Sequence, residues 1–339
     1  MAENTDTGAK ERKKDHIELA FRSRVSSSDI DSRFYYEPLL GPHPDENTDI
    51  SVTFLGKKFN APIWVSSMTG GTAIANIINK NLAKACGEYG LGMGLGSCRQ
   101  LLFNDEYFED FNVRKYIGSQ PLYANLGIAQ LEILISEGQT NKITKLINKL
   151  EADGLIVHVN PMQEWLQPEG DRFKVSPLVT IKRLLDILKC PIIVKEVGQG
   201  MGPESLKELF ALPLVAVDFG AAGGTNFALL EILRSSEKMA NHYSGLANTG
   251  HSALEMTEYV NQIVNDPASQ MLCKEVIISG GISDFLDGYY LTNKLQLISI
   301  YGQASGFLKH AQGSYEALSE YVYMQIEGFK LAKTMLKVR

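Results

Sequence analysis

The chain has 339 residues, of which 44% are hydrophobic and 21% are charged, and its formal net charge is −6. These fractions exclude a wholly disordered or fibrous chain, because both classes depart strongly from globular composition. The acidic balance argues against nucleic acid as a partner, since proteins that bind the phosphate backbone are usually basic. A small phosphorylated ligand stays possible, because it needs only a local cluster of donors.

Cysteine usage and the N-terminal sequence both predict a cytoplasmic protein. Cys86, Cys98, Cys190 and Cys273 form no C-x-x-C pair, which favours buried thiols in a reducing compartment. The first sixteen residues contain no apolar segment typical of a signal peptide. No apolar run approaches the roughly 18 residues that a membrane span needs. We therefore expect no membrane partner.

Three regions follow one another along the chain. Residues 1–11 are small and polar, and we expect a mobile tail there. Residues 12–60 are mixed in character and are predicted to form an N-terminal arm and extension that closes over the main domain. From residue 61 to 339, short apolar runs alternate with longer amphipathic stretches.

The alternating region contains eight apolar runs rich in Val, Ile, Leu or Tyr. They lie at 62–66, 91–97, 121–127, 155–160, 191–197, 214–220, 275–281 and 295–302. Helix-like segments lie among them at 73–89, 129–150 with a break at 137–138, 177–188, 225–240 and 284–293, and 314–336 follows the last run. Runs without alternation suit strands covered on both faces, and eight strand–helix repeats predict a closed (β/α)₈ barrel. A doubly wound sheet is the rival fold, but no G-x-G-x-x-G follows the first run.

Active sites of such barrels lie at the carboxyl ends of the strands. Lys195 follows the apolar residues PIIV, so its ammonium group needs a partner that offsets the cost of burial. That partner is either a carboxylate on a neighbouring strand or an electron-rich ligand. We favour the ligand, because two glycine loops of the kind that binds phosphate follow.

Those loops contain Gly223-Gly224-Thr225 and Gly280-Gly281, and Ala304-Ser305-Gly306 follows the eighth run. Backbone N–H groups in glycine loops bind anions, and the loops after strands seven and eight often hold a phosphate group in this fold. A single glycine pair is a weak indicator, because glycine is common in turns. The combination of the last two loops favours a phosphate site.

A second cluster follows the fourth run, where His158 stands close to Gln163 and Glu164 in the sequence. A lone histidine is most often a hydrogen-bonded core residue, and a lone glutamate is most often solvated. Their grouping favours a Mg²⁺ site, since Mg²⁺ is usually held by one or two carboxylates plus substrate phosphates. Far upstream, the basic run that includes Arg12, Lys13 and His16 is either a solvated tail or a clamp for a diphosphate.

Taken together, these segments resemble the type 2, FMN-dependent isopentenyl-diphosphate isomerase family, over about residues 10–330. The most specific matches are NPMQEWLQPEGDRF and VKEVGQGM, and the others are ERKKDHI, APIWVSSMTGGT, GLGMGLGSCRQ, YANLG, GGTNFALLE and IISGGI. The resemblance implies a barrel that binds FMN and interconverts isopentenyl and dimethylallyl diphosphate. It also implies Mg²⁺, a flavin usually reduced by NADPH, and no net redox chemistry.

The resemblance assigns roles to individual residues. The catalytic residues would be His158, Gln163 and Lys195, and Glu164 would hold Mg²⁺. The flavin would contact Ser67, Met68, Thr69, Ser97, Asn125, Lys195, Thr225, Gly280, Gly281, Ala304 and Ser305. The substrate would meet Arg12, Lys13, His16, Ser97, Arg99, His158 and Gln163. Because no side-chain pair is an obvious acid and base, the ring nitrogens of a reduced flavin would supply both functions, and Lys195 would hold the anionic ring.

The chain departs from the family pattern at a few positions. Gly220-Ala221 stands where the family usually has Ser-Gly, Ser283-Asp284 where a basic residue is usual, and Ser244-Gly245 where Trp-Gly is frequent. Two other functions stay open at this stage: an FMN-dependent 2-hydroxy-acid oxidase or dehydrogenase, and a flavin-binding barrel without catalysis. Barrel enzymes of this kind often associate, so a homo-oligomer, a tetramer or an octamer, is expected.

Overall fold

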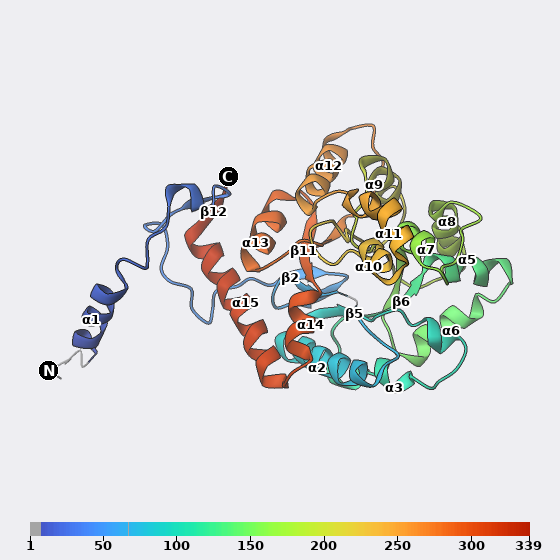
Figure 1. Cartoon of the computed structure of the whole chain (residues 1–339), viewed down its shortest axis with the longest axis horizontal. Helices are drawn as coiled ribbons and strands as arrows, with labels where there is room; N and C mark the ends of the chain where they lie inside the picture. The colour runs from blue at the N-terminus through green and yellow to red at the C-terminus, as the bar shows by residue number, and fades with distance from the viewer. Residues whose placement is uncertain (1–7, 67) are drawn as a thin grey trace.

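Eight parallel strands close into a barrel in the computed structural model, which describes residues 8–66 and 68–339 (Figure 1). The order around the barrel follows the chain, and β11 pairs with β4 to close it. The strands are β4 (Ile63–Val65), β5 (Gly92–Gly94), β6 (Leu122–Gly127), β7 (Gly154–Val159), β8 (Ile192–Glu196), β9 (Ala216–Asp218), β10 (Glu275–Ser279) and β11 (Ile298–Gln303). Each overlaps one of the eight predicted runs, so the predicted (β/α)₈ barrel is confirmed.

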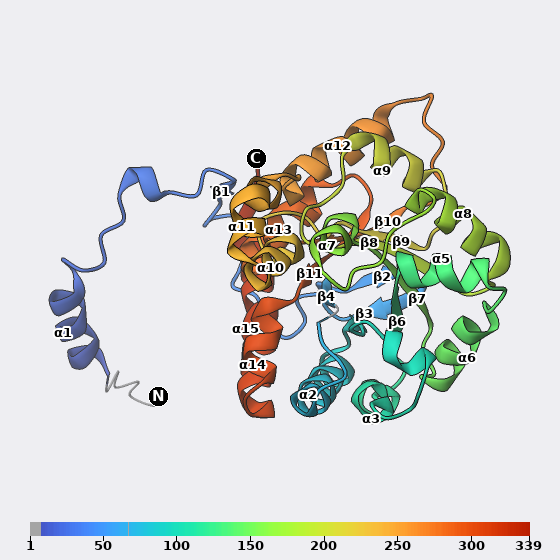
Figure 2. The same cartoon turned by 45° about the vertical axis from the view of Figure 1, so that its right-hand side comes forward.

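Helices surround the barrel and connect its strands (Figures 1 and 2). They are α2 (Ala73–Tyr89), α3 (Phe108–Phe111), α4 (Arg114–Ile117), α5 (Ile128–Ser136), α6 (Asn141–Lys149), α7 (Pro161–Leu166), α8 (Pro177–Ile187), α9 (Pro203–Phe210), α10 (Phe227–Arg234), α11 (Glu237–Tyr243), α12 (Ala253–Asn265), α13 (Phe285–Lys294), α14 (Ser305–Ala311) and α15 (Tyr315–Met335), with 3₁₀ turns η1 (Ser27–Asp29), η2 (Arg99–Leu102) and η3 (Ser244–Asn248). The predicted break at 137–138 separates α5 from α6. The stretch 225–240 differs from its prediction as one helix, because the Ser236 side chain accepts from Met239 N and starts α11.

Apolar side chains fill the barrel and form a floor beneath its carboxyl end. The floor includes Trp64, Tyr123 and Ile277, which pack with Phe54 and Phe59 of a hairpin formed by β2 (Val52–Phe54) and β3 (Lys57–Phe59). Close packing of these large rings excludes water from the amino end of the barrel.

The hairpin lies at the amino ends of the strands. Lys57 Nζ pairs with Asp153 Oδ1 at 2.7 Å, just before β7, and Leu55 N donates to Glu275 Oε2 at 2.7 Å at the start of β10. This part of the 12–60 extension therefore covers the end of the barrel opposite to the strand ends where the active site was predicted.

The remainder of the extension runs along one side of the molecule. β1 (Phe34–Tyr36) pairs antiparallel with the C-terminal β12 (Leu336–Val338), so the extension meets the C-terminal strand that follows α15. α1 (Ala9–Leu19) lies apart from the barrel in both views, and none of its residues is buried (Figures 1 and 2). Within the described ranges, no helix has the length and apolar character needed to cross a membrane.

Candidate active site

A cavity of about 500 Å³ opens at the carboxyl ends of the barrel strands. Its walls are mostly short side chains and glycines from the loops that follow the strands. They are Ser66, Met68, Gly96, Ser97, Asn125, His158, Gln163, Lys195, Val197, Gly198, Gly220, Ala221, Gly223, Gly224, Thr225, Phe227, Ser279, Gly280, Gly281, Ile282, Ser283, Gly302, Gln303, Ala304, Ser305 and Gly306. The volume falls within the range of sites for small molecules and cofactors.

Lys195 brings a cation to the inner part of this cavity. It is the last residue but one of β8, opposite Asp218 of β9 in the strand register, and its Nζ lies 3.9 Å from Asp218 Oδ2. The same Nζ donates to the carbonyl of Glu196 at 2.8 Å. Asp218 is fully buried and accepts from the Ser279 hydroxyl. Burial raises the pKa of Asp218 above its ordinary value, while the charge of Lys195 acts in the opposite direction. Lys195 thus has the carboxylate partner and also faces the cavity.

His158 is held as a neutral imidazole with a defined tautomer. Asn125 Nδ2 donates to the carbonyl of Leu95 at 3.0 Å, which leaves Asn125 Oδ1 to accept from His158 Nδ1 at 2.8 Å. Burial, with the charge of Lys195, lowers the pKa of His158 to about 4. The proton of the neutral ring is therefore on Nδ1, and Nε2 carries a free lone pair at neutral pH.

The segment after β7 orients Gln163 and Glu164. Asn160 Nδ2 donates to Gln163 Oε1 at 3.0 Å and to Glu164 Oε1 at 3.1 Å. Glu164 Oε2 accepts from the backbone N of Asp171 at 2.7 Å, and no basic side chain of the described residues pairs with this buried carboxylate. Gln163 Nε2 donates in turn to the buried Glu231 of α10 at 3.5 Å.

Two glycine loops meet at the cavity and leave no space for side chains. A Cβ on Gly280, whose φ is +90°, would lie 2.0 Å from the carbonyl of Ala221. Gly220 has a φ of +52°, and a Cβ there would lie 2.0 Å from the carbonyl of Glu196. Only glycine fits such positions without backbone movement. Glycine in place of the family's usual serine at 220 therefore suits the backbone conformation of this chain.

Most of the predicted flavin contacts lie together on the cavity wall. They are Met68, Ser97, Asn125, Lys195, Thr225, Gly280, Gly281, Ala304 and Ser305. Ser67 lies outside the described residues. Thr69 does not line the cavity; its carbonyl accepts from Asn79 Nδ2 at 3.1 Å beneath the loop.

The predicted substrate contacts fall into two groups. Ser97, His158 and Gln163 line the cavity. Arg99 lies near its edge, where Nη1 pairs with Asp171 Oδ2 at 3.1 Å. Arg12, Lys13 and His16 are on α1 and are not brought together with the others (Figure 2).

Sequence reasoning missed two buried acids, Asp218 and Glu231. Asp218 follows an apolar run in the same way as Lys195, and consecutive strands of a barrel are neighbours, so its proximity was predictable in principle. Glu231 has no comparable pattern, because it lies among the apolar residues of an amphipathic helix.

The donors on the cavity wall suit a flavin phosphate. The glycine loops offer close backbone approach, and Ser66 Oγ, on the cavity wall, is buried without a hydrogen-bond partner among the described residues. Such an atom calls for a donor or acceptor from a ligand. Glu164, the predicted Mg²⁺ ligand, is a buried carboxylate without an ion-pair partner among the described residues, but it does not line the cavity, and both of its oxygens accept hydrogen bonds. No group of three or more His, Cys, Asp or Glu side chains that could hold a metal by themselves occurs in the described part of the chain.

Fold and site together define a (β/α)₈ barrel whose cavity, at the carboxyl ends of the strands, is lined by glycine loops of the kind that binds phosphate groups. The curated isopentenyl-diphosphate delta-isomerase of Rickettsia felis is 36% identical over 331 residues, which cover 96% of this chain and 92% of that protein. The protein of the same name from Rickettsia typhi is 34% identical over the same shares. The chain belongs to the isopentenyl-diphosphate delta-isomerase family, as its motifs predict. No protein-family model matches it.

Solved structures confirm the fold independently. A flavocytochrome b2 variant with sulfite bound gives a TM-score of 0.58 at 16% identity, over 89% of this chain and 72% of that one. A mandelate oxidase variant with a monooxide FMN adduct gives 0.52 at 11% identity, over 91% and 88%. At such identities the likeness extends to the barrel alone.

Proposed function

We propose that this protein is an isopentenyl-diphosphate delta-isomerase that uses FMN, and that it interconverts isopentenyl and dimethylallyl diphosphate. The observation that carries the proposal is the joint placement of Lys195, His158 and Gln163 on one cavity wall, facing two glycine loops. The names of the Rickettsia relatives supply the substrate. The reaction moves a double bond by adding one proton and removing another, with no net oxidation.

Each side chain has a separate task in this proposal. Lys195 places its ammonium group where an electron-rich ring would lie, and Asp218 holds that group in position. His158 faces the diphosphate with Nε2, and Ser97 adds a hydroxyl donor. Gln163, held between Asn160 and Glu231, lies beside the reacting carbons. FMN, when bound and reduced, supplies ring nitrogens that give and take a proton.

The proposal includes the remaining partners. Glu164 would hold Mg²⁺, with the other positions taken by substrate phosphates and water. NADPH would serve as the reductant, and the protein would act in the cytoplasm. A homo-oligomer, tetramer or octamer, is supported by apolar side chains exposed on the extension, such as Phe21 at 77% and Leu39 at 92%.

A hydroxy-acid oxidase is disfavoured by the donors around the cavity. That reaction needs a histidine base and arginines that hold a carboxylate. The described wall of this cavity contains no arginine, and His251 lines a separate cavity beside α9.

The test is an isomerisation assay on purified protein with FMN, Mg²⁺ and isopentenyl diphosphate under anaerobic reduction. We expect dimethylallyl diphosphate as the product. A yellow protein that leaves the substrate unchanged would favour the non-catalytic flavin barrel, and oxidation of 2-hydroxy acids would favour the oxidase.

A further inference from the structure

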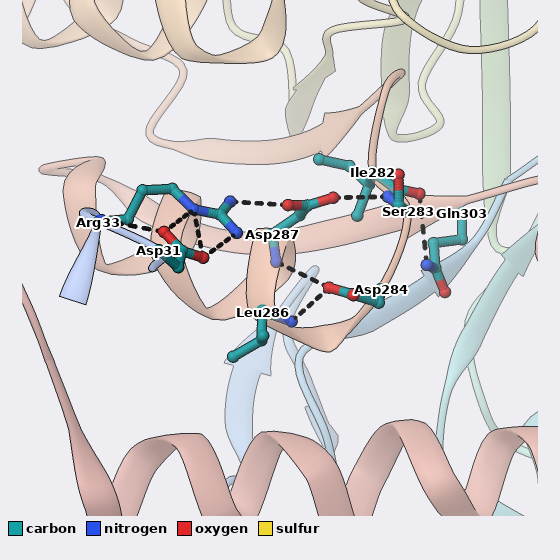
Figure 3. Close-up of polar contacts among 8 residues, drawn as sticks. All are labelled: Asp31, Arg33, Ile282, Ser283, Asp284, Leu286, Asp287 and Gln303. Atoms are coloured by element: carbon teal, nitrogen blue, oxygen red, sulfur yellow. Dashed lines mark hydrogen bonds and ion pairs between the residues drawn. The ribbon is translucent and has the colours of Figure 1, made fainter. Parts of the chain in front are cut away.

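The cavity wall that follows β10 is held in place from two directions. On the barrel side, Gln303 Nε2 donates to the carbonyl of Ile282 at 3.4 Å. On the outer side, Asp287 of α13 accepts from the backbone N of Ser283 at 2.8 Å (Figure 3). Ile282 and Ser283 both line the cavity. The conformation of this wall therefore depends on where the Asp287 carboxylate points.

Arg33 of the N-terminal extension fixes that carboxylate. Its Nη1 donates to Asp287 Oδ1 at 2.7 Å, and Nε and Nη2 of the same guanidinium bind Asp31 (Figure 3). The guanidinium lies 5.3 Å from the ring centre of Tyr290, and the Arg33 carbonyl accepts from Arg339 N at 3.0 Å. The Arg33 side chain thus joins the extension to α13, next to the pairing of β1 with β12.

The charges of Asp287 and Arg33 affect how well an anionic ligand can bind at this wall. Asp284 and Asp287 both stand directly behind the wall, and Asp284 accepts from the backbone N of Leu286 at 2.8 Å and caps α13. A free carboxylate at Asp287 would repel a phosphate group at the wall. Arg33 neutralises Asp287 and keeps it turned towards Ser283, because a forked guanidinium binds two carboxylates in fixed directions.

We propose that Arg33 and Asp287 are positioning residues for a ligand phosphate, and that Arg33 acts through Asp287. The extension thereby sets the affinity of the barrel for the phosphate end of FMN without touching it. This inference rests on the proposed function, because it takes FMN as the ligand of the glycine loops.

The experiment compares FMN with riboflavin, which has the same ring system but no phosphate. Binding of each to deflavinated protein is followed by quenching of flavin fluorescence, for the wild type, Arg33→Met, Asp287→Ala and the double variant. Loss of a charge-assisted contact predicts an FMN Kd about tenfold higher in each single variant. The riboflavin Kd should stay within about twofold, and the double variant should be no weaker than Asp287→Ala, since residues in one network are not additive.

Lys294→Ala is the matched control, since Lys294 lies at the other end of α13 and binds the carbonyl of Arg339. It should bind FMN as the wild type does. Equal FMN affinity in all variants, an equal loss for riboflavin, or additive losses would overturn the inference. Failure of the wild type to bind either flavin would instead overturn the proposed function.

Discussion

Lys195 and Asp218 face each other across neighbouring strands of the barrel, with Nζ and Oδ2 3.9 Å apart. The pair means that the cavity contains a buried cation whose charge is only partly offset by a carboxylate that does not itself line the cavity. An isolated buried ammonium would be costly, and a fully paired one would have little field left for a ligand.

Substitution of either member should therefore shift the flavin reduction potential. Lys195→Met leaves the reduced ring without its cation and should lower the potential by roughly 30–60 mV, the equivalent of a lost charged contact. Asp218→Asn should shift it in the opposite direction, because the positive charge is then less balanced. Potentiometric titration of the holoenzyme measures both. An unshifted potential in both variants would mean that the pair is purely structural.

Glu164→Gln should raise the Mg²⁺ concentration needed for half-maximal activity by about tenfold or more, while bound FMN is unchanged. The amide retains the shape of the side chain but removes the charge that attracts the cation. The control is Glu169→Gln, because Glu169 is an exposed acid that pairs with Arg234 at 2.8 Å. The measurement is the isomerisation rate of each variant as a function of Mg²⁺ concentration. Identical curves for the two variants would contradict the assignment of Glu164 as the Mg²⁺ ligand.

Diphosphate binding should take up a proton at His158. In the free protein its pKa is about 4, so the ring is neutral at pH 7, and the lone pair on Nε2 opposes a phosphate oxygen. A bound anion raises that pKa, so affinity should fall as the pH rises through the pKa of the complex and level off below about 4. Calorimetry of isopentenyl diphosphate with the oxidised holoenzyme, in buffers of different ionisation enthalpy, counts the protons. His158→Gln should remove the uptake, and an equal count in both proteins would refute the assignment.

α1 lies apart from the barrel, so a contact of its basic run with substrate is a prediction from the family resemblance alone. If α1 closes onto the diphosphate, Arg12→Ala combined with Lys13→Ala should raise the KM for isopentenyl diphosphate by about tenfold or more, given charge-assisted phosphate contacts. The melting temperature should stay unchanged, because no residue of α1 is buried. Lys14→Ala is the control on the same helix, where it removes an exposed pair with Glu18 at 3.6 Å. A wild-type KM in the double variant would show that the basic run is a solvated tail.

Barrel strands were predictable because their signal is local. PIIVKE is a continuous apolar run that ends in charged residues, and β8 occupies Ile192–Glu196. The wall residues follow from the same logic, since every strand end reaches one cavity. The hairpin at 52–59 was not predictable as a floor, because its contacts, such as Leu55 with Glu275, join residues 220 positions apart. The roles of Glu231 and Asp287 could not be predicted for a related reason. The pattern of a helix indicates which of its faces is apolar, but not which acidic side chain turns towards a neighbouring loop.

The apolar floor built by Trp64, Tyr123 and the hairpin has a kinetic consequence. The cavity is closed at the amino end of the barrel and opens only at the carboxyl end. When two ligands bind in such a cavity, the one that lies deeper must enter first and leave last. In the proposed arrangement, with the flavin ring against Lys195 and the diphosphate nearer the mouth, the cofactor would not exchange while substrate is bound. The same FMN molecule would then stay bound through successive turnovers, because bound substrate would block its only exit.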